Sequence, residues 1–309
     1  MDINVSVAVL INSDQQVLLA QRPPLKPWEG WWEFPGGKIE KNETPVDAMY
    51  REIYEEIGVK VIQFTKWVTR KYSYGGNDVT LYFFKVYTWE GEVTSKEKQK
   101  LVWTYLQKPN VAPILSANQF IQKGFDLPKY YAITNLSEIS KKVFLNQLQR
   151  KINDGLEMVQ VREKNISFNE FRKFSKEVIE ICKPKSVKVI INSDVNLAYE
   201  LKADGVHLTS KELLSIKKIP KNLIVSASCH TQKEINIAEQ LNLNFIVLSA
   251  VKKTLSHPDM KPIGWDKFQK IVNKVNIPIY ALGGLGTKNY EVALDNGAIG
   301  IASQRLIWQ

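Results

Sequence analysis

Three glutamates, Glu52, Glu55 and Glu56, lie close together in the segment REIYEEIGV of this 309-residue chain. On a helix their spacing puts the carboxylates on neighbouring turns of one side, where they repel one another. A two-glycine turn, Gly36-Gly37, comes shortly before them. A divalent cation would neutralise such a cluster, and Mg²⁺, with Mn²⁺ as its substitute, prefers hard oxygen ligands completed by water and phosphate. A solvated acidic helix face without function fits the spacing alone equally well.

The residues around this cluster predict the helix that positions it. Thr44 is a hydroxyl N-cap, Pro45 suits the first helical position, and Asp47 is an acid three residues past the cap. Gly58 is the expected end of the helix. The apolar side chains that share one side, and that we expect to be buried, are Val46, Met49, Tyr50, Ile53 and Ile57.

The pattern of the chain changes near residue 125. Before it, alternating apolar runs and hairpin-like turns indicate strands around the one helix. After it, eight short apolar runs recur with helical segments between them, which favours a parallel (β/α)₈ TIM barrel. The segment FDLPKY between the two patterns is typical of a linker. We therefore predict a first domain at residues 1–125, a linker at 126–129 and a barrel at 130–309.

Charge and composition restrict the partners of the chain. Residues 1–125 carry 15 Lys and Arg against 14 Asp and Glu, and residues 126–309 carry 27 against 18. The surplus lysines of the second half are scattered rather than striped, so we expect no stable nucleic-acid binding and only local sites for phosphorylated small molecules. The sequence leaves the oligomeric state open.

The compartment is predicted from what the sequence lacks. Its two cysteines have neither disulfide nor metal spacing, which agrees with a reducing environment. No apolar stretch approaches the length that crosses a bilayer, and the start of the chain resembles a strand rather than an export signal. We expect a cytoplasmic protein without membrane attachment.

Polar side chains follow the predicted barrel strands where they end, which is where barrels carry their chemistry. Gln160, Arg162 and Lys164 alternate at the end of the second strand and so share one face. The remaining candidates, after later strands, are Asn192, His207, His230, Gly284 and Ser303. Backbone N–H groups near the last two are suited to cradle a phosphate. His207 fits a packed core residue as well as a ligand contact.

The spacing of Gly37, Glu43 and the segment from Arg51 to Val59 resembles the Nudix box at every fixed position. The first half is most similar to MutT-type enzymes, which implies a Nudix α/β/α sandwich that hydrolyses nucleoside triphosphates with a divalent cation. The resemblance implies that Arg51 holds the glutamates by charge-assisted hydrogen bonds. It implies a metal site made of the Gly36 carbonyl, Glu52, Glu55, Glu56 and Glu97, with Glu97 as ligand or general base.

Substrate choice is also carried by the resemblance. In MutT-like proteins an arginine, a phenylalanine and an asparagine surround the purine, and Arg22, Phe34 and Asn118 stand in those places. An asparagine amide both donates and accepts, so it can bind a purine edge that has gained a proton on oxidation. Asn118 also suits a loop or cap. Asn77 stands where an arginine is expected, which alters one contact. The leading substrate is 8-oxo-dGTP, cleaved to monophosphate and pyrophosphate, as in nucleotide-pool sanitation and DNA repair.

The second half carries another resemblance. VQVREK, ADGVHL, SCHT and YALGG look like thiamine phosphate synthase and its relative TenI, a thiazole tautomerase. This implies pyrimidine and phosphate contacts from Gln160, Arg162, Lys164 and Asn192, and a thiazole phosphate held by Gly284 and Ser303. Ser193 and Lys211 stand where the synthase has magnesium-binding acids, and the loop after the sixth strand is altered.

Two functions of the barrel and two substrates of the first domain therefore stay open. For the barrel we expect a TenI-like role, either isomerisation with His230 as acid and base or binding of a phosphorylated thiazole without turnover. The hypothesis from a different functional class is that the barrel is a binding or regulatory module without catalysis. For the first domain, a thiamine-related pyrophosphate is the alternative to the oxidised nucleotide.

Overall fold

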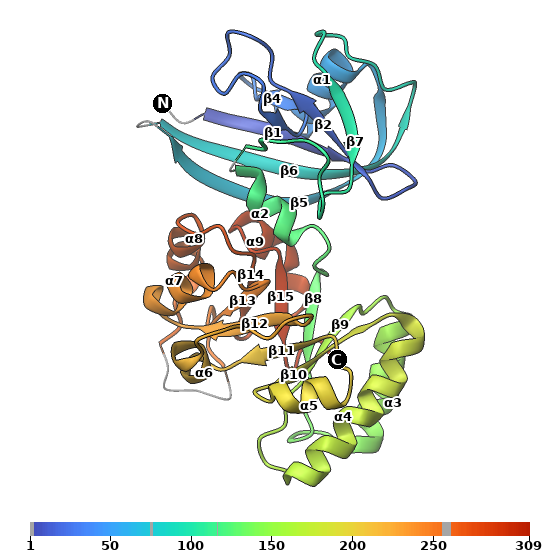
Figure 1. The fold of residues 1–309 in the computed structure, drawn as a ribbon, viewed down its shortest axis with the longest axis vertical. Coiled ribbons are helices and arrows are strands. Elements are labelled where there is room, and N and C mark those ends of the chain that lie inside the picture. The colour runs from blue at the N-terminus through green and yellow to red at the C-terminus, as the bar shows by residue number, and fades with distance from the viewer. Residues whose placement is uncertain (1–2, 75–76, 116, 255–260) are drawn as a thin grey trace. The chain divides into compact units, whose positions relative to one another are not determined.

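The computed structural model describes residues 3–74, 77–115, 117–254 and 261–309 (Figure 1). The chain forms two compact units, Met1–Phe125 and Asp126–Gln309. Each unit has its own hydrophobic core, one built around α1 and one around the barrel.

The first unit contains two sheets. A mixed sheet has the order β4-β1-β6-β5, and its strands are β1 (Ile3–Leu10), β4 (Gly36–Lys38), β5 (Lys60–Tyr74) and β6 (Asn77–Glu90). An antiparallel sheet has the order β3-β2-β7, and its strands are β2 (Val17–Gln21), β3 (Trp32–Glu33) and β7 (Leu101–Thr104). The helices of this unit are α1 (Pro45–Ile57) and α2 (Ala117–Gly124).

Strand register places the two helices on opposite faces of the mixed sheet. Ser6 lies under α1, where its Oγ donates to the carbonyl of the first helical residue at 2.7 Å. Ser6 pairs with Tyr82, which pairs with Thr69. Because successive strand residues point to opposite faces, Arg70 faces away from α1. Its guanidinium lies 4.1 Å from the ring centre of Phe120 on α2. The predicted α/β/α sandwich is confirmed.

Helix α1 begins and ends as its sequence predicts. The Thr44 side chain accepts from Asp47 N, the Asp47 carboxylate accepts from Thr44 N, and Gly58 ends the helix with φ of 77°. Met49 and Ile53 are buried, as expected, but Tyr50 is 38% exposed, so that part of the prediction is wrong. The Tyr50 ring packs against Phe64 of β5 at nearly right angles, with the ring centres 5.7 Å apart, and part of it stays exposed to solvent.

The second unit is a closed barrel of eight parallel strands in the order β10-β11-β12-β13-β14-β15-β8-β9, which confirms the predicted TIM barrel. The strands are β8 (Tyr130–Ile133), β9 (Met158–Val161), β10 (Lys188–Asn192), β11 (Gly205–Leu208), β12 (Ile224–Cys229), β13 (Phe245–Leu248), β14 (Ile279–Leu282) and β15 (Gly300–Ser303). The α-helices around them are α3 (Lys141–Asn153), α4 (Phe168–Cys182), α5 (Val195–Glu200), α6 (Ser210–Ser215), α7 (Gln232–Gln240), α8 (Gly264–Val272) and α9 (Tyr290–Asp295).

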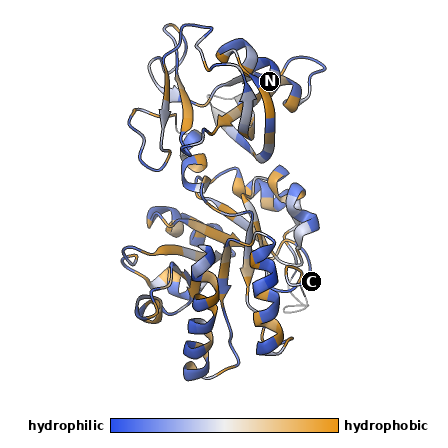
Figure 2. Ribbon diagram, turned by 90° about the vertical axis from the view of Figure 1, so that its right-hand side faces the viewer, coloured by the Kyte–Doolittle hydropathy of each residue, from blue (hydrophilic) through white to orange (hydrophobic). Residues whose placement is uncertain are grey.

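The barrel helices are amphipathic, and Figure 2 shows hydrophilic and hydrophobic residues alternating along them while the strands are mainly hydrophobic. Burying one stripe of each helix on the strands builds the core. Among the described helices of the chain, none has the length and apolar character needed to cross a membrane.

Large side chains fill the barrel interior. The Tyr131, Phe245 and Tyr280 rings meet with centroids 5.1–5.7 Å apart. His207 lies beside them, 5.9 Å from Tyr131. The barrel is therefore a packed core rather than a pore, and a ligand has access only at the ends of the strands.

Candidate functional site

Arg51 ties the acidic side of α1 to the strand before it. Its Nη1 donates to Glu52 Oε1 at 2.7 Å and to Glu55 Oε2 at 3.2 Å. Its Nε donates to Glu43 Oε1 at 2.9 Å, and Nη2 donates to the carbonyl of Lys38 at 3.0 Å. The hydrogen bond to Glu43 is the largest of the contacts that raise the pKa of Arg51 above its ordinary value. The guanidinium thus stays charged and fixes two members of the glutamate row.

Glu56 lies deeper than the other members of the row. Its Oε2 accepts a hydrogen bond from Gly36 N at 3.1 Å. Burial, and then repulsion by Glu97 and Glu52, raise the pKa of Glu56 to about 7. Gln99 Nε2 lies 3.5 Å from Glu56 Oε1 and 3.2 Å from Glu97 Oε2. The carboxyl of Glu56 is therefore held beside two other carboxyl groups. Its protonation changes near neutral pH.

Two features of the backbone bring these acids together. A Cβ at Gly37 would lie 2.2 Å from the Glu52 carboxylate, so a larger residue there would displace this carboxylate from its place beside Arg51. The loop before β7 is attached to the end of α1, because Thr94 N donates to Ile57 O at 3.0 Å and Lys96 N donates to the Glu56 carbonyl at 2.9 Å. These bonds satisfy helix-end carbonyls and place Glu97 beside α1.

The donor set suits Mg²⁺, although the acids do not converge on one point. Within the described ranges, no three His, Cys, Asp or Glu residues are arranged to hold one ion. Glu52 and Glu55 are bound to Arg51, while Glu56 and Glu97 lie with Gln99. Carboxylates are nevertheless the ligands that Mg²⁺ takes. Burial and then repulsion by Glu97 and Glu52 raise the pKa of Glu56, and a bound dication would relieve that repulsion.

The predicted purine contacts are brought near one another by backbone pairing. Trp32 of β3 donates from its N to the Pro113 carbonyl at 2.8 Å and accepts from Leu115 N at 3.0 Å. Phe34 follows this strand and is 3% exposed, and Asn118, near the start of α2, is 5% exposed. The Asn118 Nδ2 is buried with no hydrogen-bond partner among the described residues. A buried amide without a partner is costly unless a ligand satisfies it.

Arg22 is engaged with protein groups. Its Nη1 donates to Glu33 Oε2 at 2.5 Å, and its Nε donates to the Pro27 carbonyl at 2.7 Å. Burial raises the pKa of Glu33, against the lowering effect of Arg22. Contact between Arg22 and a substrate would therefore require a change of partner. Asn77 begins β6, and its side chain lies outside the described residues.

Strands β9 and β10 bring several predicted barrel residues together. Gln160 Nε2 donates to Asn192 Oδ1 at 3.0 Å. The positive charge of Arg162 is the main cause that lowers the pKa of Lys164, which places these two cations near each other. Burial lowers the pKa of Arg162 itself. This end of the barrel is therefore cationic.

His207 is a core residue of the barrel. Its Nδ1 lies 2.8 Å from Ser226 Oγ, and its Nε2 lies 2.9 Å from Ser228 Oγ. Burial, and then the charge of Arg162, lower the pKa of His207 to about 3. The ring is neutral at neutral pH and both its nitrogens are occupied. These contacts fit the packed interpretation of His207, and its role as a ligand contact stays a prediction.

An acidic residue, Glu212, directly follows Lys211 at the start of α6. Lys211 is exposed, whereas Glu212 Oε2 accepts from Ser193 Oγ at 3.1 Å. Asn192 Nδ2 donates in turn to Ser193 Oγ at 3.0 Å. The residue that faces Ser193 is therefore a glutamate, which also accepts from the backbone N of the α6 N-cap, Thr209.

The other predicted barrel residues lie along the later strands. His230 follows β12, and its Nδ1 lies 3.2 Å from the Ser249 carbonyl. Gly284 follows β14 with φ of 62°, and a Cβ there would lie 2.5 Å from Lys253 O. Ser303 ends β15 with its Oγ donating to the Leu285 carbonyl at 2.8 Å. The Ser303 hydroxyl proton is thus used within the protein, which leaves backbone groups for a phosphate.

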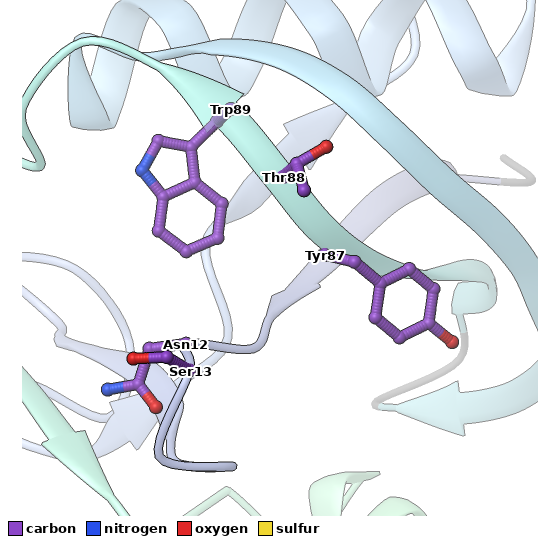
Figure 3. Close-up of a pocket in the computed structure, with 5 residues that line it drawn as sticks. All are labelled: Asn12, Ser13, Tyr87, Thr88 and Trp89. Carbon is purple, nitrogen blue, oxygen red and sulfur yellow. The ribbon is translucent and has the colours of Figure 1, made fainter.

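A pocket in the first unit lies apart from all of these residues. It is lined by Asn12, Ser13, Tyr87, Thr88 and Trp89, with the last three on β6 (Figure 3). None of the five carries a charged side chain or an imidazole, and none was predicted as a site residue.

Sequence reasoning assigned no role to Glu43, Gln99 or Glu212. Glu43 is a fixed member of the box, and its spacing to Arg51 was the available signal. The Thr209-to-Glu212 spacing is that of a capping box, which points the Glu212 side chain back to the start of α6. For Gln99 the sequence offered no signal, because its contacts depend on how the loop docks.

Fold and site together define a Nudix domain followed by a thiamine-synthase-type barrel. Residues 2–119 match the family described as NUDIX domain, and residues 130–307 match the family described as thiamine monophosphate synthase. The chain therefore belongs to the thiamine monophosphate synthase family and carries an N-terminal Nudix domain.

Relatives of both halves support this assignment. The chain is 38% identical over 179 residues to an Aquifex aeolicus (strain VF5) protein whose name provisionally assigns it as thiamine-phosphate synthase 2, covering 57% of this chain and 96% of that one. It is 31% identical over 178 residues to a thiamine-phosphate synthase of Fusobacterium nucleatum, covering 57% and 86%. It is 41% identical over 95 residues to an 8-oxo-dGTP diphosphatase of Proteus vulgaris, covering 31% and 85%.

Proposed function

We propose that the first unit is a Mg²⁺-dependent pyrophosphohydrolase whose preferred substrate is 8-oxo-dGTP. The observation that carries the proposal is the acidic side of α1, where Glu56 is held against Glu97 and Glu52 and Arg51 fixes its neighbours. A relative of this half is an 8-oxo-dGTP diphosphatase, which supports the same substrate.

The residues divide the reaction between them. Glu52, Glu55, Glu56 and Glu97, with the Gly36 carbonyl, would hold the ion. When bound, a divalent ion withdraws charge from the phosphates and lowers the pKa of water. Water attacks phosphorus, a glutamate takes its proton, and the bond to the leaving group breaks to give nucleoside monophosphate and pyrophosphate. Arg51 keeps Glu52 and Glu55 oriented.

The base is proposed to meet Asn118. Its buried amide nitrogen has two donors and no partner in the described chain, so a purine carbonyl would satisfy it. The neighbouring Phe34 ring supplies apolar area. An oxidised purine that reaches Asn118 would form hydrogen bonds with its amide. An unoxidised purine presents its donors and acceptors differently and would not form the same bonds.

A substrate comparison tests this function. The full chain with Mg²⁺ is offered 8-oxo-dGTP, dGTP and thiamine diphosphate, and released pyrophosphate and phosphate are measured separately. We expect the highest kcat/KM, with pyrophosphate as product, for 8-oxo-dGTP. Faster turnover of thiamine diphosphate would favour the alternative of a thiamine-related substrate, and equal indifference to all three would refute both.

We infer for the barrel a site for a phosphorylated thiazole that needs no metal. Two cations lie close together here, since the charge of Arg162 lowers the pKa of Lys164. The carboxylate next to Ser193 already has hydrogen-bond partners, because Glu212 accepts from the hydroxyl groups of Ser193 and Thr209. A cationic mouth binds a phosphate directly.

Replacing His230 distinguishes isomerisation from binding without turnover. If the barrel is a tautomerase, His230→Ala abolishes proton exchange of the bound thiazole phosphate, as followed by NMR in deuterated water. If the parent chain binds thiazole phosphate and exchanges no proton, the barrel is a binding module. Absence of binding to the parent would refute the proposed ligand.

A further inference from the structure

The side-chain amide of Gln99 lies between two acids that come from different elements. Its Nε2 is 3.2 Å from Glu97 Oε2 and 3.5 Å from Glu56 Oε1. An amide nitrogen carries two N–H donors, so it can donate to both carboxylates at once. The hydrolysis described above gives Gln99 no part.

The loop around Gln99 is fixed on both sides but not at Glu97 itself. Lys96 N donates to the Glu56 carbonyl at 2.9 Å on one side, and Gln21 N donates to Lys100 O at 2.8 Å on the other. Between these attachments Lys98 adopts a φ of 63°, in the left-handed region that lysine seldom occupies. The side chains on either side of this bend meet, since Gln99 Nε2 donates to Glu97 Oε2 at 3.2 Å.

Without a donor between them, Glu56 and Glu97 would separate. The two carboxylates repel each other, and Glu97 is exposed to solvent while Glu56 is half-buried. Glu97 is the one free to move, since it lies on a loop and has water on its other side. A side chain that donates to both acids offsets the repulsion.

We propose that Gln99 is a positioning residue of the hydrolytic site, which holds Glu97 beside Glu56 so that both offer oxygens to a divalent ion. This inference rests on the function proposed for the first unit. The amide keeps Glu56 and Glu97 close together before the ion binds. Bringing these ligands together on binding then costs less free energy.

Binding of Mn²⁺ to the nucleotide-free full chain tests the inference, with free Mn²⁺ measured by electron paramagnetic resonance. Gln99→Met keeps the length of the side chain and removes its donors. Gln63→Met, at an exposed position of β5 in the same unit, is the matched control. We expect the Kd for Mn²⁺ to rise about tenfold in Gln99→Met, the scale of one lost charge-assisted hydrogen bond, and to stay unchanged in Gln63→Met.

A double-mutant cycle with Glu97→Gln separates positioning from general damage to the loop. If Gln99 acts through Glu97, adding Gln99→Met to Glu97→Gln raises the Kd less than twofold further, and all variants share the thermal midpoint of the parent. An unchanged Kd in Gln99→Met, or fully additive effects in the cycle, would overturn the inference alone. A parent chain that binds no Mn²⁺ would overturn the proposed function, and this inference with it.

Discussion

In the first unit, carboxylates gather around the end of α1, whereas the mouth of the barrel presents Arg162 and Lys164. The first site balances its acids with one guanidinium and leaves Glu56 with a pKa near 7. In the barrel, the charge of Arg162 lowers the pKa of Lys164, and Glu212 accepts hydrogen bonds from hydroxyl groups.

The two sites would bind the same chemical group, a phosphate, in two different ways. An acidic site repels phosphate until a dication lies between them, so its activity depends on metal. A cationic site attracts phosphate directly, and its affinity depends on salt and on the protonation of its side chains. On the functions proposed above, one chain would join a metal-dependent site to a metal-independent one.

Removing divalent metal should separate the two sites most strongly. With EDTA, we expect pyrophosphate release from 8-oxo-dGTP to fall at least about 10³-fold, because the acids alone repel the substrate. Thiazole phosphate binding, followed by calorimetry on the same sample, should change less than about twofold. Loss of both activities together would break the comparison.

Asn118→Ala should reduce the preference of the first unit for the oxidised base. The buried amide would no longer bind a purine edge, which lowers the ratio of kcat/KM for 8-oxo-dGTP over dGTP by about 10- to 100-fold. Asn110→Ala, at an exposed site of the same unit, is the control. A preference that survives in Asn118→Ala would show that other residues select the base.

His207 should make the barrel, and not the first unit, less stable in mild acid. Because burial lowers its pKa from 6.5 to about 3, the unfolded chain binds a proton more readily than the folded one below pH 6.5. The stabilisation is present above pH 6.5 and is lost as pH falls towards 3. From pH 7 to pH 5 this costs the barrel about 2 kcal/mol.

Hydrogen exchange of barrel-strand amides, read by mass spectrometry, gives the free energy of unfolding of that unit. His207→Asn should show a smaller loss between pH 7 and pH 5 than the parent. Equal losses in both proteins would mean that His207 is protonated in the folded barrel.

Arg162→Ala should have the smallest effect of the series, weakening thiazole phosphate binding by about tenfold. Lys164 remains as a second cation, which limits the loss. Arg172→Ala removes an exposed arginine paired with Glu200 and should leave the affinity unchanged. A binding constant that is insensitive to Arg162 would place the phosphate elsewhere.

Local signals explain how much of the fold the sequence predicted. Thr44, Pro45 and Gly58 act within one turn of their own positions, so α1 could be predicted to its last residue. The eight apolar runs also predicted the barrel strands correctly, since each strand is buried on both faces and is therefore apolar along its length. Tyr50 was misjudged because its burial depends on neighbours in β5 that spacing along the helix does not reveal.

The sites were less predictable because they join distant segments. The Nudix spacing identified the glutamates, yet nothing local indicated that Gln99 would lie between two of them or that Arg51 would hold Glu52 and Glu55 apart from Glu56. In the barrel, a one-residue difference separated exposed Lys211 from Glu212. Which of the two faces Ser193 is set by where α6 begins.

The account depends most on the acids of α1 acting with a divalent ion. Its most direct test is the Mg²⁺-dependent release of pyrophosphate from 8-oxo-dGTP by Glu55→Gln, compared with the parent and with Glu92→Gln, an exposed acid of the same unit. The account predicts that Glu55→Gln loses at least about 10²-fold in kcat while Glu92→Gln keeps the parent rate. Parental hydrolysis by Glu55→Gln would contradict it.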